Sequence, residues 1–279
     1  MNRICILVVL LFPFFTQASE QAPAERIVAL SPHGVELLFS LGVGDRIIAT
    51  TDYADYPEAA NDIERVGGYH GVEIERIVML QPDLIVAWAD GNKAEEIEKL
   101  ISLGLPVYES HTKNLNGIKT ELNALGKLTG TQEKAKSLIS DFEEFLARIQ
   151  KQNENKSKVS FFYQLWQNPI QTISEHSWIN EIMDLCGGQN IITREKYDIG
   201  YPQIGIETVL INKPQVIIIP SEHGAVTNVD SIWNDWQEIP AVKNKHIFKI
   251  NGDILHRFSL RVTQGIDQTC SLFDRARNT

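Results

Sequence analysis

The seven histidines of this chain are the side chains with the widest chemical range, so their spacing is informative. None of them lies in an H-E-x-x-H motif or another close pair, the arrangement that binds a catalytic zinc ion. The sequence also contains no Walker phosphate loop and no G-x-S-x-G nucleophile turn. Gly42 and Gly44 begin like a dinucleotide loop, but Ile47 replaces the third glycine and a strand-like run follows. These patterns disfavour catalysis and make binding the first chemistry to consider, while a metal ion held by distant residues stays open.

Aromatic side chains stand close to the ends of strand-like runs in both halves of the chain. They are Tyr53, Tyr69, Trp88, Trp166 and Tyr201. Open parallel sheets bind ligands beyond the carboxyl ends of their strands. Any one such aromatic residue is more often core or rim packing, but five of them predict the walls of a site for a broad, flat, partly apolar ligand.

A polar segment follows the last strand-like run, and it reads Asp253, Ile254, Leu255, His256, Arg257. The Arg257 guanidinium is suited to a phosphate or an amide oxygen, and the Asp253 carboxylate to an amide N–H. A salt bridge within the loop explains the same two residues equally well. Both interpretations therefore stay open at this point.

Two stretches, VEIERIVMLQPDLIVAW from residue 72 and IGIETVLINKPQVIII from residue 204, repeat one helix-then-strand pattern. Glu75 matches Glu207 and Pro82 matches Pro214, each pair 132 positions apart. The apolar residues of each helix share one face, and the glutamate points away from it. A carboxylate in the first turn also suits the helix dipole, which is a purely structural role. The repetition adds a second interpretation, two equivalent anionic sites on the protein surface.

These residues depend on a scaffold of strand-like runs, four in each half, separated by helix-like stretches. The runs are 26–30, 46–51, 83–88, 106–110, 159–165, 190–193, 215–221 and 246–250. Such alternation predicts an α/β fold with mostly parallel sheets covered on both faces. A helix opening at Ser31 and ending near Leu41 also matches one predicted to open at Ser174 and to end near Leu185. The two matched regions favour duplication over convergence.

Residues 131–156 separate the two halves and carry an apolar stripe at three- and four-residue steps. The stripe consists of Leu138, Ile139, Phe142, Phe145, Leu146 and Ile149. It predicts one long helix that joins two Rossmann-like lobes, with an N-terminal lobe at 24–130 and a C-terminal lobe at 157–279. Because a helix resists bending, we expect the cleft between the lobes to be largely pre-formed.

The N-terminus has the pattern of a secretory signal peptide over residues 1–18. Arg3 precedes an apolar run at 4–15, and Thr16 and Ala18 place small residues at the cleavage site. We therefore expect a soluble exported protein. Its formal charge of −10 disfavours a nucleic acid partner and is compatible with a basic docking surface or with a generic acidic surface.

Removal of the signal peptide leaves two cysteines, Cys186 and Cys270. In an oxidising compartment an isolated pair usually forms a disulfide. The loop between them is 84 residues long, for which chain entropy gives roughly 4–5 kcal/mol of stabilisation. The alternative is a pair of free buried thiols.

Four segments resemble the periplasmic cobalamin-binding proteins of ABC importers, within the helical-backbone (class III) substrate-binding proteins. They are RIVALSPHGVELLFSLG, TDYADYP, VGGYHGVEIERIVMLQPDLIVAW and LCGGQNI, together with the cysteine pair, and the resemblance runs from about Arg26 to the C-terminus. It implies a non-enzymatic, monomeric periplasmic protein with cobalamin as its transported ligand and no cofactor or metal. The implied partner is the permease dimer of the inner membrane. In the family one glutamate on each lobe meets permease arginines, and those positions are Glu75 and Glu207 here.

The resemblance also places aromatic residues of this chain in the ligand site. Tyr53 and Trp88 fall on a family tyrosine and tryptophan that line the corrinoid site. Tyr69 and Tyr201 stand where the family often has tryptophan, and Trp166 is assigned from its position alone.

Asp253 and Arg257 match the ends of a family segment that touches the ligand. Between them the sequence departs from the family pattern, because Ile254 and Leu255 replace aromatic residues and His256 replaces an acid. The segment is therefore assigned to the ligand site by its two ends.

Two alternatives remain. Haem or a ferric siderophore would occupy the same class of fold. Haem would need an axial ligand such as Tyr69, His70 or His256, and a siderophore would favour several arginines where only Arg257 stands out. A more distant alternative is an exported metal-dependent enzyme, which needs a ligand cluster and a general base that the sequence does not assemble.

Overall fold

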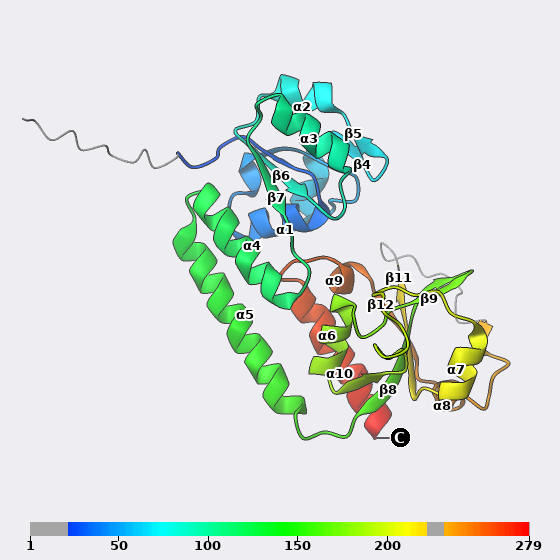
Figure 1. Cartoon of the computed structure of the whole chain (residues 1–279). Coiled ribbons are helices and arrows are strands. Elements are labelled where there is room, and N and C mark those ends of the chain that lie inside the picture. The colour runs from blue at the N-terminus through cyan, green and yellow to red at the C-terminus, as the bar shows by residue number, and fades with distance from the viewer. Residues whose placement is uncertain (1–21, 222–231, 279) are drawn as a thin grey trace, which may run out of the picture.

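The chain folds into two α/β lobes connected by a pair of long helices (Figure 1). The structure is a computed structural model and describes residues 22–221 and 232–278, so the predicted signal peptide at 1–18 lies outside the described residues. Within the described part, no helix has both the length and the apolar character needed to cross a membrane. The predicted fold class is confirmed. The lobe limits of 24–130 and 157–279, with the linking helix at 131–156, remain our proposed division.

The N-terminal lobe contains a five-stranded parallel sheet in the order β3-β2-β1-β6-β7. Its strands are β1 (Ile27–Ala29), β2 (Ile47–Thr50), β3 (Glu64–Arg65), β6 (Leu84–Trp88) and β7 (Val107–Ser110). A separate antiparallel hairpin, β4 (Gly67–Gly68) and β5 (Gly71–Val72), has Tyr69 and His70 at its turn. The central strands are almost entirely apolar because helices cover both faces of the sheet.

Side-chain alternation divides this sheet between two cores. Val28 and Ile85 face outward and pack with the helices α2 (Ile74–Leu80) and α3 (Ala94–Ser102). Ile27 and Val86 face the opposite way, toward α1 (Pro32–Ser40). The lobe also has two short 3-10 helices, η1 (Gly44–Arg46) and η2 (Glu58–Asp62).

The start of α1 follows the predicted capping pattern. Ser31 Oγ accepts a hydrogen bond from the Gly34 N–H at 3.2 Å, and Pro32 occupies the first turn.

The C-terminal lobe contains parallel strands in the order β10-β8-β11-β12, with β9 antiparallel to β8. Its strands are β8 (Val159–Gln167), β9 (Ile170–Thr172), β10 (Gly188–Asn190), β11 (Val216–Ser221) and β12 (Ile247–Asn251). The order matches β2-β1-β6-β7 of the first lobe, which supports a duplicated unit. The strand predicted at 190–193 instead ends at Asn190, because the Asn190 side chain accepts from the Ile192 N–H at 2.9 Å and turns the chain away.

Five helices in the described part of this lobe cover the sheet: α6 (Trp178–Leu185), α7 (Ile206–Asn212), α8 (Pro240–Lys243), α9 (Asp253–His256) and α10 (Val262–Arg277). The outer face packs with α7 and α8, and the inner face with α6 and α10. The helix predicted to open at Ser174 begins at Trp178 instead. The Ser174 hydroxyl closes a separate turn by accepting from the His176 N–H at 3.1 Å, and Ser177 caps the helix through the Ile179 N–H at 3.2 Å.

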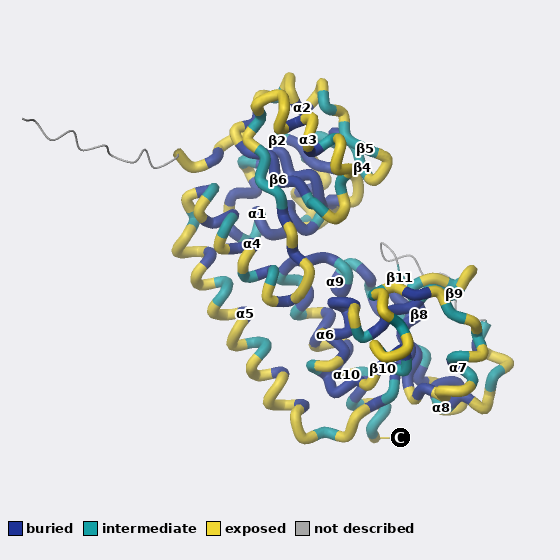
Figure 2. The backbone as a smooth tube through the Cα atoms, in the orientation of Figure 1, coloured by how far each residue is buried: buried dark blue, intermediate teal, exposed yellow. Residues whose placement is uncertain are grey.

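Two helices, α4 (Leu115–Leu128) and α5 (Gln132–Asn153), lie against each other and connect the lobes (Figure 1). Phe142 and Ile149 of the predicted apolar stripe are buried, while the opposite side of α5 is exposed (Figure 2). One continuous apolar cluster extends from the first lobe through both helices into the second. The predicted Cys186–Cys270 disulfide is confirmed and joins the end of α6 to α10.

Candidate functional site

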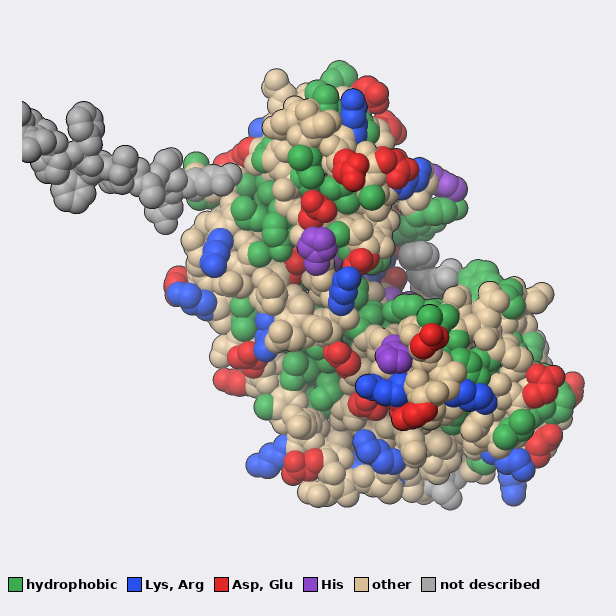
Figure 3. Space-filling view, in the orientation of Figure 1, with side chains coloured by type: hydrophobic (Ala, Val, Ile, Leu, Met, Phe, Trp, Pro, Cys, Tyr) green, Lys and Arg blue, Asp and Glu red, His purple; other side chains and the backbone are tan. Residues whose placement is uncertain are grey.

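A cavity of about 590 Å³ lies between the two lobes. The first lobe contributes residues at the ends of β6 and β7. The second contributes the end of β8, the start of α6 and the segment around α9. The lining residues are Trp88, Asp90, Thr112, Lys113, Leu165, His176, Ser177, Trp178, Ile179, Tyr201, His256 and Phe258. The space-filling view shows the molecule narrowing between the lobes, with hydrophobic side chains along the facing edge of the lower lobe (Figure 3). The cavity therefore occupies the position where parallel sheets bind ligands.

A chain of aromatic rings crosses from one lobe to the other beside this cavity. The ring of His33 meets Trp88 edge-on at a centroid distance of 5.1 Å, and it meets Phe258 of the second lobe at 5.8 Å. Phe258 in turn packs on Trp178 at 4.3 Å. Such contacts hold the ring planes in defined orientations, so much of the cavity wall is rigid and apolar.

The Trp88 indole is positioned by its immediate neighbours. Asn92 accepts from the Trp88 backbone N–H at 2.7 Å and donates to the Leu30 carbonyl at 2.9 Å. The ring covers Gly91, where a side chain would collide with it. The indole Nε1 is buried and has no hydrogen-bond partner among the described residues.

Two buried imidazoles near the cavity are held in the neutral form. Burial, together with the nearby Arg257 charge, lowers the pKa of His33 to about 4. Burial also lowers the pKa of His256 to about 4, although Asp253 opposes the shift. His256 Nε2 is hydrogen bonded to the Tyr163 hydroxyl at 2.8 Å. Near neutral pH these rings therefore offer hydrogen-bonding groups without a charge.

Arg257 joins the lobes through a buried ion-pair network. Its Nη1 contacts Glu36 Oε1 at 2.9 Å and Asp55 Oδ1 at 2.8 Å, both in the first lobe. Its Nη2 contacts Asp253 Oδ1 at 3.0 Å and donates to the Tyr53 carbonyl at 3.1 Å. Burial alone would lower the pKa of Arg257, but the hydrogen bonds to Asp55 and Glu36 outweigh it and the net pKa is raised. The structure thus contains the salt bridge within the segment, between Arg257 and Asp253, and adds ion pairs from Arg257 to Glu36 and Asp55 across the lobes.

Glu36 is the centre of the same network on the first lobe. It is 3% exposed and also accepts from Arg261 Nη1 at 2.9 Å and from the Ser259 hydroxyl. The Arg261 guanidinium lies 3.9 Å from the centre of the Tyr56 ring, which adds a cation–π contact between the lobes. These contacts hold the facing edges of the lobes in one relative position.

The structure brings only part of the predicted ligand site together at the cavity. Trp88, Tyr201 and His256 line it. Tyr53, Tyr69 and Trp166 are not among its lining residues, and their exposed fractions are 53%, 75% and 54%. The backbone of Tyr53 is tied to the ion-pair network, while Tyr69 and Trp166 stand on separate hairpins.

Ile254 and Leu255 are not among the residues that line the cavity. Both are buried, at 8% and 0% exposure, within the main apolar core. Gly265 of α10 allows this packing, because a side chain there would collide with the Ile254 carbonyl and approach Leu255 within 2.8 Å. Asp253 lies in the ion-pair network instead of at the cavity.

Sequence reasoning missed His33, Trp178 and Phe258, although each contributes to the cavity or to the ring chain beside it. A local signal existed for two of them. His33 follows the capping serine of α1 by two positions, and Trp178 directly follows the capping serine of α6. The first residues of helices that follow strand ends were therefore the positions from which the sequence could have identified these two side chains. Phe258 had no comparable signal.

Glu75 and Glu207 occupy equivalent exposed positions on α2 and α7. Each helix has seven residues and is followed by a residue with positive φ, Gln81 at 48° and Lys213 at 45°. No ion pair involving either glutamate occurs in the described part of the chain. Both carboxylates are therefore accessible at the outer ends of the lobes.

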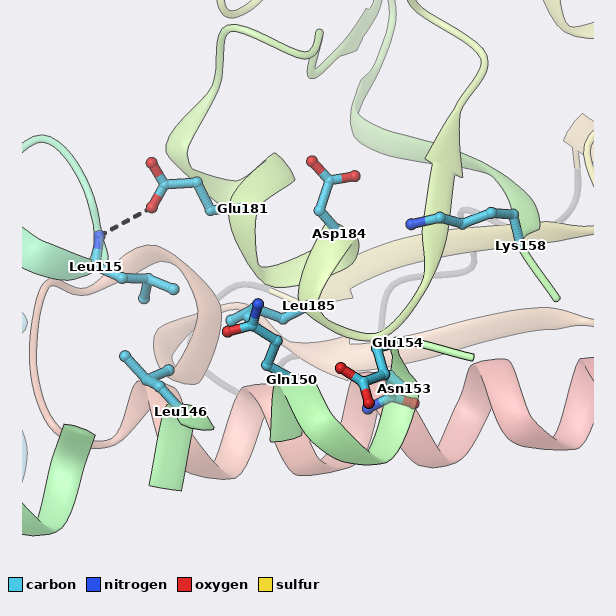
Figure 4. A pocket seen from close by; sticks show the side chains of 9 residues that line it. All are labelled: Leu115, Leu146, Gln150, Asn153, Glu154, Lys158, Glu181, Asp184 and Leu185. Atoms are coloured by element: carbon cyan, nitrogen blue, oxygen red, sulfur yellow. Dashed lines mark hydrogen bonds between the residues drawn. The ribbon is translucent and has the colours of Figure 1, made fainter. Parts of the chain in front are cut away.

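A second cavity, of about 530 Å³, lies between α5 and α6 (Figure 4). Glu181 closes one side by accepting from the Leu115 N–H at 3.0 Å, and Lys158 and Asp184 lie across from α5. Burial raises the pKa of Asp184. No aromatic residue lines this cavity, and it flanks the linking helix away from the strand ends. The cavity between the lobes is therefore the better candidate for a ligand site.

No group of three or more histidine, cysteine, aspartate or glutamate side chains in residues 22–221 and 232–278 is arranged to hold a metal ion.

Comparison with known proteins identifies close relatives along nearly the whole chain. Residues 27–254 match the family described as periplasmic binding protein. The chain is 38% identical over 278 residues to the vitamin B12-binding protein of Vibrio campbellii, covering 99% of this chain and 98% of that protein. The crystal structure of the periplasmic vitamin B12 binding protein of Vibrio cholerae has a TM-score of 0.81 at 35% identity, covering 92% of this chain and 99% of that one.

The same fold also occurs in a more distant protein. The periplasmic heme-binding protein RhuT from Roseiflexus sp. RS-1 has a TM-score of 0.81 at 19% identity, covering 91% of this chain and 99% of that one. A likeness at this identity concerns the fold alone.

Proposed function

This chain belongs to the periplasmic binding protein family, and from that premise we propose that it captures cobalamin between its lobes and delivers it to an ABC importer. The observation that carries the proposal is the cavity walled by aromatic residues from both lobes, Trp88 on one side and Trp178 and Tyr201 on the other. A corrinoid is a broad, flat ring with a fringe of amides, so it needs apolar faces and scattered polar groups. The relatives named for vitamin B12 binding support this choice.

The polar groups of the cavity suit an amide fringe. His256 lines the cavity and is neutral at ordinary pH. Lys113 and Asp90 stand at the cavity edge, with Lys113 Nζ and Asp90 Oδ1 3.6 Å apart and both side chains exposed. They supply one cation and one anion for an amide oxygen, a phosphate or an amide N–H. This set of polar groups supports binding.

Tyr53, Tyr69 and Trp166 keep a proposed role as outer contacts. In Figure 1 the β4–β5 hairpin with Tyr69 and the β8–β9 hairpin with Trp166 project from the two lobes on the same side of the molecule. The exposure of these three side chains supports contact with a ligand that extends beyond the cavity. Asp253 and Arg257 act instead by holding the lobes in position around the ligand.

Delivery requires a second partner, which we assign to the permease dimer of the inner membrane. Glu75 and Glu207 would each meet a basic side chain of one permease subunit. The duplicated lobes have an approximate twofold relation that matches the symmetry of a dimer. Such exposed charges chiefly set orientation and association rate. The protein would work in the periplasm, as its family description indicates, after removal of the signal peptide at 1–18.

An absorbance titration with cyanocobalamin tests the proposed ligand, with haemin as the competing candidate. We expect a saturable spectral change with cyanocobalamin at micromolar protein and none of comparable affinity with haemin. Saturable haemin binding without cyanocobalamin binding would assign the cavity to the haem alternative.

A second experiment tests the division between ligand and transporter contacts. Glu207→Arg should leave cyanocobalamin affinity unchanged and impair uptake by cells that depend on this protein, because α7 lies outside the cavity. Loss of cyanocobalamin binding in this variant would contradict the division.

A further inference from the structure

Two exposed apolar residues accompany the twin glutamates. Ile211 exposes 78% and Met79 72% of its surface, more than any other large aliphatic side chain in the described part of the chain. One isolated exposed apolar residue is ordinary on a soluble protein. These two differ from that background because they occupy equivalent positions of the duplicated unit, 132 residues apart, like Glu75 and Glu207.

Helix geometry places each apolar residue next to its glutamate. Met79 follows Glu75 by four positions on α2, and Ile211 follows Glu207 by four positions on α7. Residues four apart lie one turn above each other on one helix face. On the opposite face Ile77 and Val209 are fully buried and fasten the helices to their sheets. Each lobe therefore presents one carboxylate and one apolar side chain together, on a short helix anchored by core packing.

We infer that each glutamate and its apolar neighbour form a two-part contact with the importer, so that every permease subunit offers a basic side chain beside an apolar hollow. This inference rests on the proposed delivery function and adds the chemistry of the partner surface. The two residue types do different work. An exposed carboxylate speeds and orients encounter, whereas burial of an apolar side chain in a fitted hollow slows dissociation.

Charge and repetition favour a twofold protein partner over the other possible occupants. A lipid surface rich in anionic headgroups would repel the adjacent carboxylates and a chain with a formal charge of −10. A second copy of this chain would set the glutamates of one molecule against those of the other, because both ends carry the same group. A dimeric partner with two equivalent basic sites would attract both glutamates, so it avoids the charge repulsion that opposes a lipid surface or a second copy.

Binding kinetics with the cognate importer in lipid nanodiscs test the inference. The protein is loaded with cyanocobalamin, and the variants are Met79→Gln, Ile211→Gln and the double variant. We expect each single variant to dissociate about tenfold faster, and the double about a hundredfold faster, with an association rate close to wild type. Glu75→Gln and Glu207→Gln should instead lower chiefly the association rate.

Ile101→Gln is the matched control, because Ile101 is 47% exposed on α3 and has the apolar Ile97 four positions earlier in place of an acid. It should leave both rates unchanged. If Met79→Gln and Ile211→Gln dissociate from the importer at the wild-type rate, the inference is wrong. It is also wrong if the only effect of these substitutions is a loss of self-association or a loss of binding to lipid vesicles. Failure of the proposed function is a separate outcome, since wild-type protein would then not bind cyanocobalamin at all.

Discussion

The two lobes are alike at their outer ends and different where they face each other. Four strands of each sheet follow the same order. The helices α2 and α7 share length, the left-handed residue after the helix and the position of the glutamate. On the facing edges, the first lobe has Trp88, while the second has Trp178, Tyr201 and His256. The repeated part suits a partner with matching twofold symmetry, whereas an asymmetric ligand is better surrounded by two different walls.

The lobes also differ in how they are braced. The second lobe is cross-linked by Cys186–Cys270, close to Asn153 at the end of the linking helix, whose Nδ2 lies 3.7 Å from Cys270 Sγ. The first lobe has no disulfide in its described residues, and it is held to the second by the contacts of Glu36 and Asp55. The second lobe therefore has a covalent brace, whereas the boundary between the lobes is held by these ion pairs together with the shared apolar cluster.

Reduction of the disulfide should give the largest change and confine it to the second lobe. Dithiothreitol, or the double variant Cys186→Ser and Cys270→Ser, should lower the free energy of unfolding by roughly 4–5 kcal/mol, because a loop of 84 residues is released. Urea denaturation followed by tryptophan fluorescence measures this, since Trp166, Trp178 and Trp233 lie in that lobe. The double variant should not respond to dithiothreitol. If the free energy of unfolding changes by less than about 1 kcal/mol, the disulfide does not stabilise this lobe through chain entropy.

Disruption of the ion-pair network should come next and should affect both lobes together. Arg257→Met leaves Glu36 buried beside fewer donors, and we expect a loss of about 3–5 kcal/mol in the free energy of unfolding. Lys119→Met is the matched control, because it breaks the more exposed 2.7 Å pair with Glu143 and should cost at most about 1 kcal/mol. Equal losses in the two variants would remove the special role of the boundary.

Acid should weaken both lobes through one histidine in each. His33 and His256 have folded pKa values of about 4, so the unfolded chain takes up protons first as pH falls below about 6.5. Stability is therefore full near pH 7 and declines between about pH 6.5 and 4, by on the order of 3 kcal/mol per histidine. Urea midpoints at several pH values for wild type, His33→Asn and His256→Gln measure how steeply stability falls with pH. If the variants show the same pH dependence as wild type, the acid sensitivity comes from other titratable groups.

Truncation of one ring in each wall should give the smallest of these effects. Trp88→Ala and Tyr201→Ala should each weaken cyanocobalamin binding by about 1.5–3 kcal/mol, because each removes apolar contact area from one side of the ligand. Calorimetric titration measures the affinities. Leu103→Ala, at a site 48% exposed beyond the end of α3, should bind like wild type. If only one of the two ring variants loses affinity, the ligand rests on a single lobe.

Local sequence pattern was sufficient for much of the fold. Runs of isoleucine and valine around Ile85 and Ile217 predicted the central strands, because a strand covered on both faces is apolar along its length. Spacing of Phe142 and Ile149 predicted the linking helix. Errors arose where a side chain redirected the backbone, as Asn190 does at the end of β10 and Ser177 at the start of α6.

The amino-acid sequence by itself determined a duplicated α/β unit, a connecting helix, a cysteine pair and two matched glutamates, because each depends on composition or on periodicity over short stretches. Only the tertiary structure decided the role of Arg257, whose partner Glu36 lies 221 residues away, and which rings surround one cavity. Contacts over such separations depend on how the lobes are set against each other. That relation comes from packing along α5 and the shared core, which no short stretch of sequence contains.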